Sequence, residues 1–189
     1  MERCDWCGDD PLYVEYHDTE WGVPLRDEQR MFEFLCLEGA QAGLSWITIL
    51  RKRPGYLKAF DQFDVSTNAH YGDDELEQRL LNPEIVRNRL KVFAVRKNAR
   101  ATLARYDEGI TLTEFLWNFV DGKPIQNHWR TMDEVPATTP LSERISKEMK
   151  KRGFPFVGPT IIYAHMQATG IVNDHMVTCP RHAECAALG

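Results

Sequence analysis

Two pairs of cysteine and histidine, one near each end of the chain, have the residue types that most directly allow chemistry. Cys4 and His17 form the first pair, and His175 and Cys179 form the second. Each pair offers one thiolate and one imidazole, which are ligands that tetrahedral zinc prefers. Because nearly the whole chain separates the pairs, a shared metal would hold its two ends together. We therefore predict one structural Zn²⁺ per chain, with four protein ligands and no open position for activating water.

Three further residues compete for a place in this metal shell. Cys7 stands in a Cys-x2-Cys spacing with Cys4, and His182 and Cys185 follow the second pair. The alternative to a metal site is a group of free thiols near the chain ends. Five cysteines are an odd number for a disulfide framework, and the charged N-terminal segment is not typical of a signal peptide. We therefore expect a cytoplasmic protein, in which thiols stay reduced and bind metal.

An aromatic and acidic segment surrounds the first metal pair and indicates a pocket for a flat ligand. Its members are Trp6, Tyr13, Tyr16, Trp21, Glu38 and Trp46. The alternative is that these aromatic residues belong to the core. Glu38 is more informative, because it ends an apolar helical run and we expect it to be partly buried. A buried carboxylate needs a partner, and the exocyclic amine of a stacked base would serve; the alternative is a solvent-exposed helix end.

Composition and periodicity predict a mostly helical chain with no clear β-hairpin and no internal repeat. A length of 189 residues with 43% hydrophobic residues is enough for one domain or two small lobes. No run of eighteen apolar residues occurs, so we expect no membrane span. Asp27 is predicted to cap a first helix, and Thr111 with Glu114 forms a capping box before another.

Proline and polar residues predict the remaining boundaries. Ser45 is predicted to cap a short helix over 46–53 that Pro54 ends, and Asn82 with Pro83 is predicted to start a long helix. Residues 122–140 are predicted to form a polar loop, and Thr139-Pro140 to begin a helix that runs to Lys151.

A glycine-bracketed turn, Arg152-Gly153-Phe-Pro-Phe-Val-Gly158, is predicted between that helix and the one that Pro159 opens. Such a turn presents free backbone N–H groups at a helix N-terminus, where an anion can bind. Lys150 and Lys151 precede the turn, so a nucleic-acid phosphate is a sensible ligand. The alternative is that the turn only packs two helices together.

Net charge is −5, which argues against a protein that binds nucleic acid over its whole surface. Basic residues are nevertheless grouped. One group without any acidic residue is Arg87, Arg89, Lys91, Arg96, Lys97, Arg100 and Arg105, and a second is Arg144, Lys147, Lys150, Lys151 and Arg152. These groups predict a basic face on an acidic protein, unless they only solvate helix surfaces.

Five separated blocks of this sequence resemble the DNA-3-methyladenine glycosylase I family, in the same order and over essentially the full length. The blocks are Arg3-Cys4-x-Trp6, Tyr16-His17-Asp-x-Glu-Trp21-Gly-Val-Pro24, Leu37-Glu38-Gly-x-Gln41-Ala-Gly-Leu-Ser-Trp46, Lys151-Arg-Gly-Phe-x-Phe-Val-Gly158 and Gly170-x-Val-Asn-Asp-His175. The resemblance implies an all-α, helix-hairpin-helix glycosylase fold with a zinc that ties the termini together. It implies a single glycosylase unit over residues 1–189, with its hairpin at about residues 152–159.

The same resemblance implies an activity and a partner. The expected reaction is excision of 3-methyladenine from alkylated double-stranded DNA by a monomeric enzyme. The lesion would be flipped out and its N-glycosidic bond hydrolysed, which leaves an abasic site. No lysine is placed as a Schiff-base nucleophile, so we expect no strand cleavage.

Roles for individual residues also follow from the resemblance. The zinc ligands would be Cys4, His17, His175 and Cys179. The groups that bind the base would be Glu38, to which we assign the catalytic role, with Tyr16, Trp46, Trp6, Tyr13 and Trp21. The DNA contacts would be Gln41, Gly43, Leu44, Gly153, Gly158, Lys150 and Lys151. Cys7 and the tail with His182 and Cys185 depart from the family pattern.

Asp174 is the residue whose role the resemblance leaves open. Most members of the superfamily use an aspartate after the hairpin, but Asp174 adjoins His175, so we expect it to act through the metal site. Two other functions stay open: a non-catalytic, zinc-stapled DNA-binding module, and a zinc hydrolase with Glu38 as base. Binding of alkylated DNA without base release would favour the module, and an open metal position would favour the hydrolase.

Overall fold

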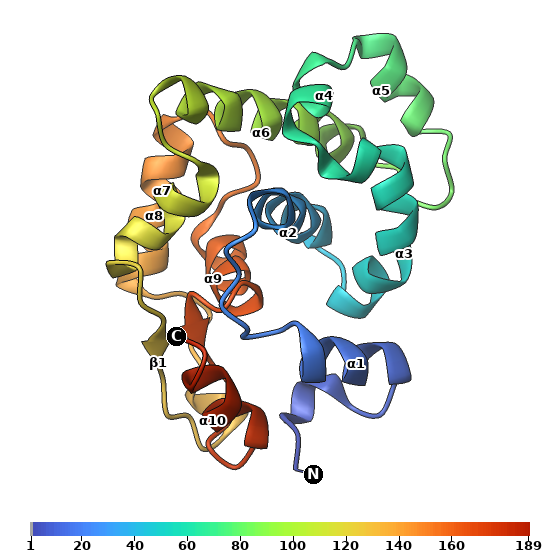
Figure 1. The fold of residues 1–189 in the computed structure, drawn as a ribbon. Helices are drawn as coiled ribbons and strands as arrows, with labels where there is room; N and C mark the ends of the chain where they lie inside the picture. Colours follow the sequence, from blue (N-terminus) through green and yellow to red (C-terminus); the bar gives the residue numbers. More distant parts are fainter. Residues whose placement is uncertain (1) are drawn as a thin grey trace.

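The computed structural model describes residues 2–189 and is built mainly of helices (Figure 1). The α-helices are α1 (Pro11–Thr19), α2 (Glu28–Gln41), α3 (Trp46–Ala59), α4 (Val65–His70), α5 (Asp73–Arg79), α6 (Arg89–Asp107), α7 (Leu112–Trp117), α8 (Pro140–Lys151), α9 (Pro159–Ala168) and α10 (Pro180–Ala186). Short 3-10 turns cover Asp5–Cys7, Asp61–Phe63, Asn118–Val120 and Met132–Glu134. The predicted helical fold is confirmed.

Helix α2 lies at the centre of the molecule, with α3 to α6 on one side and α7 to α9 on the other (Figure 1). Every residue from 31 to 40 is buried, as expected for a helix that is packed on all sides. Asp27 caps this helix as predicted, because its Oδ1 accepts a hydrogen bond from the backbone N–H of Arg30 at 2.8 Å. The end of α2 therefore places Glu38 deep in the protein.

The prediction that Pro54 ends the third helix is wrong, because α3 continues through Pro54 to Ala59. A proline inside a helix removes one backbone hydrogen bond. Here packing offsets that loss: Tyr56 is buried in the main core, and Gly55 lies so close to Glu84 that an added Cβ would come within 2.5 Å of it. Tertiary contacts thus outweigh the local signal.

The prediction that Asn82 and Pro83 start the long helix is also wrong. Helix α6 begins at Arg89, and Asn88 is its N-cap, with Oδ1 accepting from the backbone N–H of Lys91 at 3.1 Å. The preceding segment is held as a turn because the Tyr56 hydroxyl accepts a hydrogen bond from the backbone N–H of Val86. The second Asn in this stretch was the correct cap signal.

The segment predicted as a polar loop, residues 122–140, contains short regular structure. Its strand β1 (Ile125–Gln126) pairs in parallel with β2 (Val172–Asn173), with Ile125 opposite Val172. This pairing brings the middle of the chain against the segment that carries His175. The predicted capping box at Thr111 and Glu114 is present, and Thr139 caps α8 as predicted.

Close backbone contact also fixes the segment that leads to His175. Gly170 has a φ of +68°, and a Cβ there would lie 2.4 Å from the carbonyl carbon of Val23. Only glycine fits at this position. The contact is reinforced by the hydrogen bond from the backbone N–H of Leu25 to the carbonyl of Thr169 at 2.9 Å. The two ends of the chain are therefore held together by packing as well as by the candidate metal ligands.

Candidate functional site

The four predicted metal ligands form one buried cluster. Their ligand atoms all lie within 4.8 Å of one another. Cys4 Sγ is 3.6 Å from His175 Nδ1, and Cys179 Sγ is 3.7 Å from His17 Nε2. A tetrahedral zinc with bonds of about 2.0–2.3 Å would place neighbouring ligand atoms at such separations. The cluster therefore has the donor set and the spacing of a closed, four-ligand metal site.

Hydrogen bonds orient both imidazoles toward the cluster. His17 Nδ1 pairs with Asp18 Oδ1 at 2.8 Å, and Asp18 is held in turn by Arg3. His175 donates from Nε2 to the carbonyl oxygen of Trp21 at 2.9 Å. Outer partners of this kind commonly fix the ring orientation of metal-binding histidines. Burial lowers the pKa of both imidazoles, so each nitrogen that faces the cluster is free to coordinate.

The three competing residues lie outside the four-residue cluster. The Cys7 thiol donates to the carbonyl of Cys4 at 3.3 Å, and His182 Nε2 hydrogen-bonds the carbonyl of Asn127 at 2.7 Å. Cys185 is buried elsewhere, near Gly22. Within residues 2–189, no other group of three or more Cys, His, Asp and Glu side chains has metal-binding spacing.

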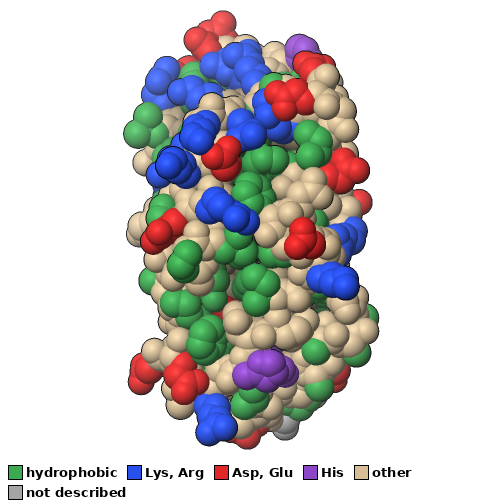
Figure 2. Space-filling view, turned by 90° about the vertical axis from the view of Figure 1, so that its left-hand side faces the viewer, with side chains coloured by type: hydrophobic (Ala, Val, Ile, Leu, Met, Phe, Trp, Pro, Cys, Tyr) green, Lys and Arg blue, Asp and Glu red, His purple; other side chains and the backbone are tan. Residues whose placement is uncertain are grey.

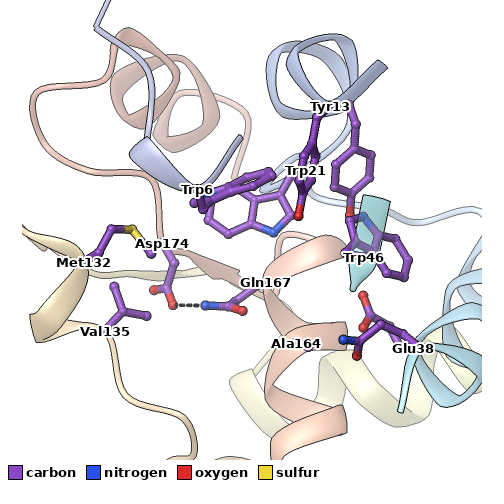
Figure 3. Close-up of a pocket in the computed structure, with 12 residues that line it drawn as sticks. Trp6, Tyr13, Trp21, Glu38, Trp46, Met132, Val135, Ala164, Gln167 and Asp174 are labelled. Carbon is purple, nitrogen blue, oxygen red and sulfur yellow. Dashed lines mark hydrogen bonds between the residues drawn. The ribbon is translucent and has the colours of Figure 1, made fainter. Parts of the chain in front are cut away.

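A cavity of about 220 Å³ lies beside this cluster and contains the predicted aromatic residues (Figure 3). It is smaller than the roughly 300–1,000 Å³ of sites for drug-sized ligands, and its size suits a single flat ring system. The predicted residues that line it are Trp6, Tyr13, Tyr16, Trp21, Glu38, Gln41 and Trp46. They come from the N-terminal segment, α1, the turn that follows α1, α2 and α3.

The aromatic wall is braced against the metal cluster. The Trp21 ring meets the His175 ring edge to face, with centroids 4.6 Å apart. Trp6 in turn packs against Trp21 at 4.9 Å and Tyr13 at 5.0 Å, and the Tyr16 and Trp46 centroids are 5.6 Å apart. A change at the cluster would therefore reach the pocket wall through these ring contacts.

Glu38 is more buried than predicted, with an exposed fraction of only 4%. Within residues 2–189 the structure gives its carboxylate no hydrogen bond or ion pair. Burial accordingly raises the pKa of Glu38 to about 8. The carboxylate thus faces the cavity without a protein partner, a costly arrangement that a cationic or amine-bearing ligand would relieve. Burial, and secondarily the nearby Glu38 carboxylate, raise the pKa of the Tyr16 phenol, so Tyr16 keeps its proton.

Five residues that line the cavity were not predicted as part of it: Met132, Val135, Ala164, Gln167 and Asp174. Asp174 is 1% exposed, and its carboxylate accepts four hydrogen bonds, none from a candidate metal ligand. The expectation that Asp174 acts through the metal site therefore differs from its observed contacts. The sequence held no local signal for Met132 and Val135, because the β1–β2 pairing and the hydrogen bonds of Asn127 and Trp129 to Asp174 carry their loop to the cavity.

The predicted DNA-contacting loop after α2 lies at the edge of the cavity. Gln41 lines the cavity and donates from Nε2 to the carbonyl of Leu44 at 2.6 Å, while the Leu44 side chain is 39% exposed. Lys91 of α6 also holds this loop in place, because its Nζ donates hydrogen bonds to the carbonyls of Ala40 and Ala42. Leu44 therefore projects from a firmly held turn.

The predicted glycine turn connects α8 and α9. At Gly158, which caps α9, an added Cβ would meet no atom within 4 Å, so this face of the turn is open. Phe156 packs on the other side against Gly39 of α2, where an added Cβ on Gly39 would lie 3.1 Å from the Cβ of Phe156. The turn thus both leaves backbone exposed and contacts α2 beside Glu38.

Both basic groups make contacts within the protein. In the first, Arg89, Arg96 and Arg105 form ion pairs, and Lys91 and Arg100 bind backbone carbonyls. The second group lies on α8 and the turn after it, on the side of the molecule where Figure 2 shows Lys and Arg gathered in the upper half. Lys151 and Arg152 share Glu148 there. The first group is therefore largely structural.

The sequence and the fold are both similar to those of known proteins. Residues 6–182 match the model of the family described as methyladenine glycosylase. DNA-3-methyladenine glycosylase 1 of Escherichia coli (strain K12) is 48% identical over 179 residues, which cover 95% of this chain and 96% of that protein. A crystal structure of 3-methyladenine DNA glycosylase I superposes with a TM-score of 0.93 at 49% identity, over 95% of this chain and 98% of that one.

A variant 3-methyladenine DNA glycosylase I solved in complex with 3-methyladenine is also similar, with a TM-score of 0.92 at 32% identity over 95% of this chain and 97% of that one. A helical fold with a base-sized aromatic cavity and these relatives defines the class: the protein is a glycosylase, an enzyme that hydrolyses glycosidic bonds. More particularly, the chain belongs to the methyladenine glycosylase family. Within residues 2–189, none of the helices has the length and apolar character needed to cross a bilayer.

Proposed function

We propose that this protein removes 3-methyladenine from alkylated double-stranded DNA by hydrolysing its N-glycosidic bond. The observation that carries the proposal is Glu38, a buried carboxylate without a protein partner, facing an aromatic cavity of base size. The names of the similar proteins support the same substrate. A base inside a duplex is out of reach, so the lesion nucleotide must first leave the stack, at a cost of a few kcal/mol.

Recognition rests on the charge of the lesion. Methylation at N3 makes the adenine of the intact nucleotide cationic. Trp46 would stack on this cation, and cation–π attraction contributes about 2 kcal/mol in a desolvated site. Glu38 would accept a hydrogen bond from the N6 amine, and Tyr16, which stays protonated, would donate to the base. Trp6, Tyr13 and Trp21 would form the remaining walls.

The proposed hydrolysis needs no general acid to protonate the leaving base. Water adds to C1′ of the sugar as the C1′–N9 bond breaks, and the bonding electron pair moves to N9. The positive charge of the base is neutralised by this pair, so the base leaves as neutral 3-methyladenine. The proton lost by the attacking water goes to solvent or to a carboxylate of the cavity. Because the leaving group is already activated, we assign Glu38 mainly to binding and electrostatic stabilisation, and we infer that no strand cleavage follows.

DNA would meet the protein at the loop after α2 and at the glycine turn. Leu44, held between Gln41 and the Gly43 turn, would fill the space that the flipped nucleotide leaves. The open backbone from Gly153 to Gly158 would approach a phosphate, as helix N-termini do. The α8 lysines, Lys150 and Lys151, would add salt-dependent attraction.

Zinc is the metal we propose for the four-residue cluster. Two thiolates and two imidazoles are a donor set typical of zinc, and four protein ligands would leave no position for water. The metal would therefore stabilise the joined chain ends and take no part in the reaction. It would also keep Trp21 in place through the ring contact with His175.

The arrangement of the pocket supports one functional unit per chain. Its lining runs from Trp6 to Asp174, so no part of the chain forms it alone. Since the pocket is complete within one chain, we infer a monomer. All five cysteines are unpaired and buried, which supports a reducing, cytoplasmic location.

Free-base analysis by chromatography, after incubation with methylated duplex DNA, tests this proposal. We expect release of 3-methyladenine, little or no 7-methylguanine, and an intact abasic strand. Guanine presents a carbonyl where adenine has its amine, and Glu38, which a cationic base would keep ionised, would repel that oxygen. Comparable release of 7-methylguanine would contradict the pocket assignment, and nicking would contradict hydrolysis alone. Binding of alkylated DNA without release of any base would indicate a DNA-binding module instead.

A further inference from the structure

The loop after α2 that carries Leu44 is held by a side chain from a helix far away in the sequence. Helix α6 packs against α2 (Figure 1). Lys91 lies in the first turn of α6, where Asn88 caps the helix by accepting from the backbone N–H of Lys91. Lys91 Nζ donates hydrogen bonds to the carbonyl oxygens of Ala40 at 2.8 Å and Ala42 at 2.5 Å. Because these carbonyls flank the last residue of α2, Lys91 joins the end of the helix to the loop.

Two carbonyls at the end of α2 depend on Lys91. In a continuing helix the backbone N–H of Leu44 would donate to Ala40, but here it donates to the carbonyl of Gln41 at 2.7 Å. Within residues 2–189, neither the Ala40 nor the Ala42 carbonyl accepts a hydrogen bond from any other group of the protein. The last carbonyls of a helix have no partner inside it and carry the negative end of its dipole. A lysine ammonium suits this place, because it has a positive charge and three donors.

The charge of Lys91 is not used in an ion pair. Its neighbours on α6, Arg89 and Arg96, both pair with carboxylates of α5. Lys91 has no carboxylate within ion-pair distance in the part of the chain that the structure describes. Its side chain is half-buried, and its ammonium is engaged by the two carbonyls. Lys91 is therefore placed to shape the loop and not to attract a phosphate.

We propose that Lys91 is a positioning residue for nucleotide flipping, which holds the loop in the conformation that projects Leu44. The proposal rests on the proposed function, because it takes Leu44 as the wedge, the side chain that fills the gap left by the lesion nucleotide. Two hydrogen bonds between Gln41 and Leu44 close the turn on itself, and Gly43 has a φ of +77° within it. Lys91 anchors this closed turn to α6. An anchored loop does not have to be ordered at the moment when the wedge enters the duplex.

A loosened loop should slow extrusion of the base without altering the pocket that receives it. Flipping a nucleotide out of a duplex costs a few kcal/mol, and a wedge helps only if it is in position when the stack opens. A free base needs no extrusion, so its binding depends on Glu38 and Trp46 and not on the anchor of the loop. Excision from duplex DNA and binding of the free base therefore separate the role of Lys91 from a general effect on the fold.

Lys91→Met removes the ammonium and keeps most of the aliphatic stem. In single-turnover reactions with saturating protein, we expect release of 3-methyladenine from methylated duplex DNA to fall about tenfold, as for loss of one hydrogen bond to a charged group. The affinity for the free base and the salt dependence of duplex binding should stay at wild-type values. Lys58→Met, which removes the same charge at an exposed position on α3, is the matched control and should leave all three measurements unchanged.

Three results for Lys91→Met would overturn the proposal. Loss of free-base binding would show that Lys91 supports the pocket itself. A slope of log affinity against log salt concentration reduced by about one would show that Lys91 binds a phosphate. Excision at the wild-type rate would show that the loop needs no anchor.

A double variant tests whether Lys91 acts through Leu44. Leu44→Ala alone should slow excision from the duplex, and adding Lys91→Met should slow it no further, because no wedge remains to be positioned. Additive losses would overturn the proposal. A wild-type rate for Leu44→Ala would also overturn it, while leaving the proposed glycosylase function intact. If the wild-type protein releases no 3-methyladenine, the proposed function itself fails, which is a separate outcome.

Discussion

Replacing Glu38 with glutamine should make the protein more stable at high pH while weakening its activity. Burial raises the pKa of Glu38 from 4.5 to about 8. The folded protein therefore holds this proton to higher pH than the unfolded chain does. Between these two pKa values the unfolded state binds fewer protons, so the free energy of unfolding falls as pH rises.

The size of the effect follows from the shift. Each pKa unit corresponds to about 1.4 kcal/mol, so ionised Glu38 destabilises the fold by about 5 kcal/mol above the folded pKa. Between pH 6 and pH 8 the change amounts to about 2 kcal/mol. The amide introduced by Glu38→Gln stays neutral, so this part of the pH dependence disappears. Any cost of burying the amide is the same at both pH values and cancels.

Urea unfolding of wild-type protein and Glu38→Gln at pH 6 and pH 8, with constant ionic strength and saturating zinc, measures this difference. Glu15→Gln, at an exposed position on α1, controls for the change in net charge. We expect the variant to gain about 2 kcal/mol over wild type on going from pH 6 to pH 8. The variant should also bind free base weakly and excise 3-methyladenine slowly. Parallel stability curves would refute the argument that Glu38 is buried without a partner. Wild-type excision by Glu38→Gln, together with inactive but metal-replete Asp174→Asn, would show that Asp174 is the catalytic carboxylate.

Three further predictions concern the metal, the glycine turn between α8 and α9, and the stacking residue Trp46. Metal analysis and anomalous scattering should find one zinc per chain. Cys4→Ser should lose this zinc and become more sensitive to proteolysis at both termini, whereas Cys185→Ser should retain it. Zinc loss in Cys185→Ser but not in Cys4→Ser would show that Cys185, and not Cys4, is a ligand. Gly158→Val should weaken duplex binding about tenfold without affecting free-base binding, because a side chain blocks approach of a phosphate; equal loss of free-base binding would show that the turn is a packing element. Lys150→Ala should reduce the slope of log affinity against log salt concentration by about one. Trp46→Ala should weaken binding of the free base, measured by titration, by about 1–3 kcal/mol, and Trp46→Phe should recover part of that loss. Equal binding by the wild-type protein and both variants would exclude stacking on Trp46.

Local signals predicted the helices whose boundaries depend on local hydrogen bonds. Asp27, Thr111 and Thr139 cap the helices predicted for them, because a capping side chain bonds backbone two or three residues away. Pro54 misled for the opposite reason. Its effect on α3 depends on Tyr56 and the close contact at Gly55, which no local pattern contains.

The residue types alone determined which chemistry this protein can hold: two Cys and His pairs for a metal, aromatic residues for a flat ligand, and Glu38 for an amine or a cation. Tertiary structure decided how those groups act. Burial raises the pKa of Glu38, and parallel pairing of β1 with β2 brings Met132 and Val135 to the cavity. Protonation and pocket shape depend on groups far apart in the chain, because desolvation and hydrogen bonding are set by whatever packs around an atom, not by its sequence neighbours.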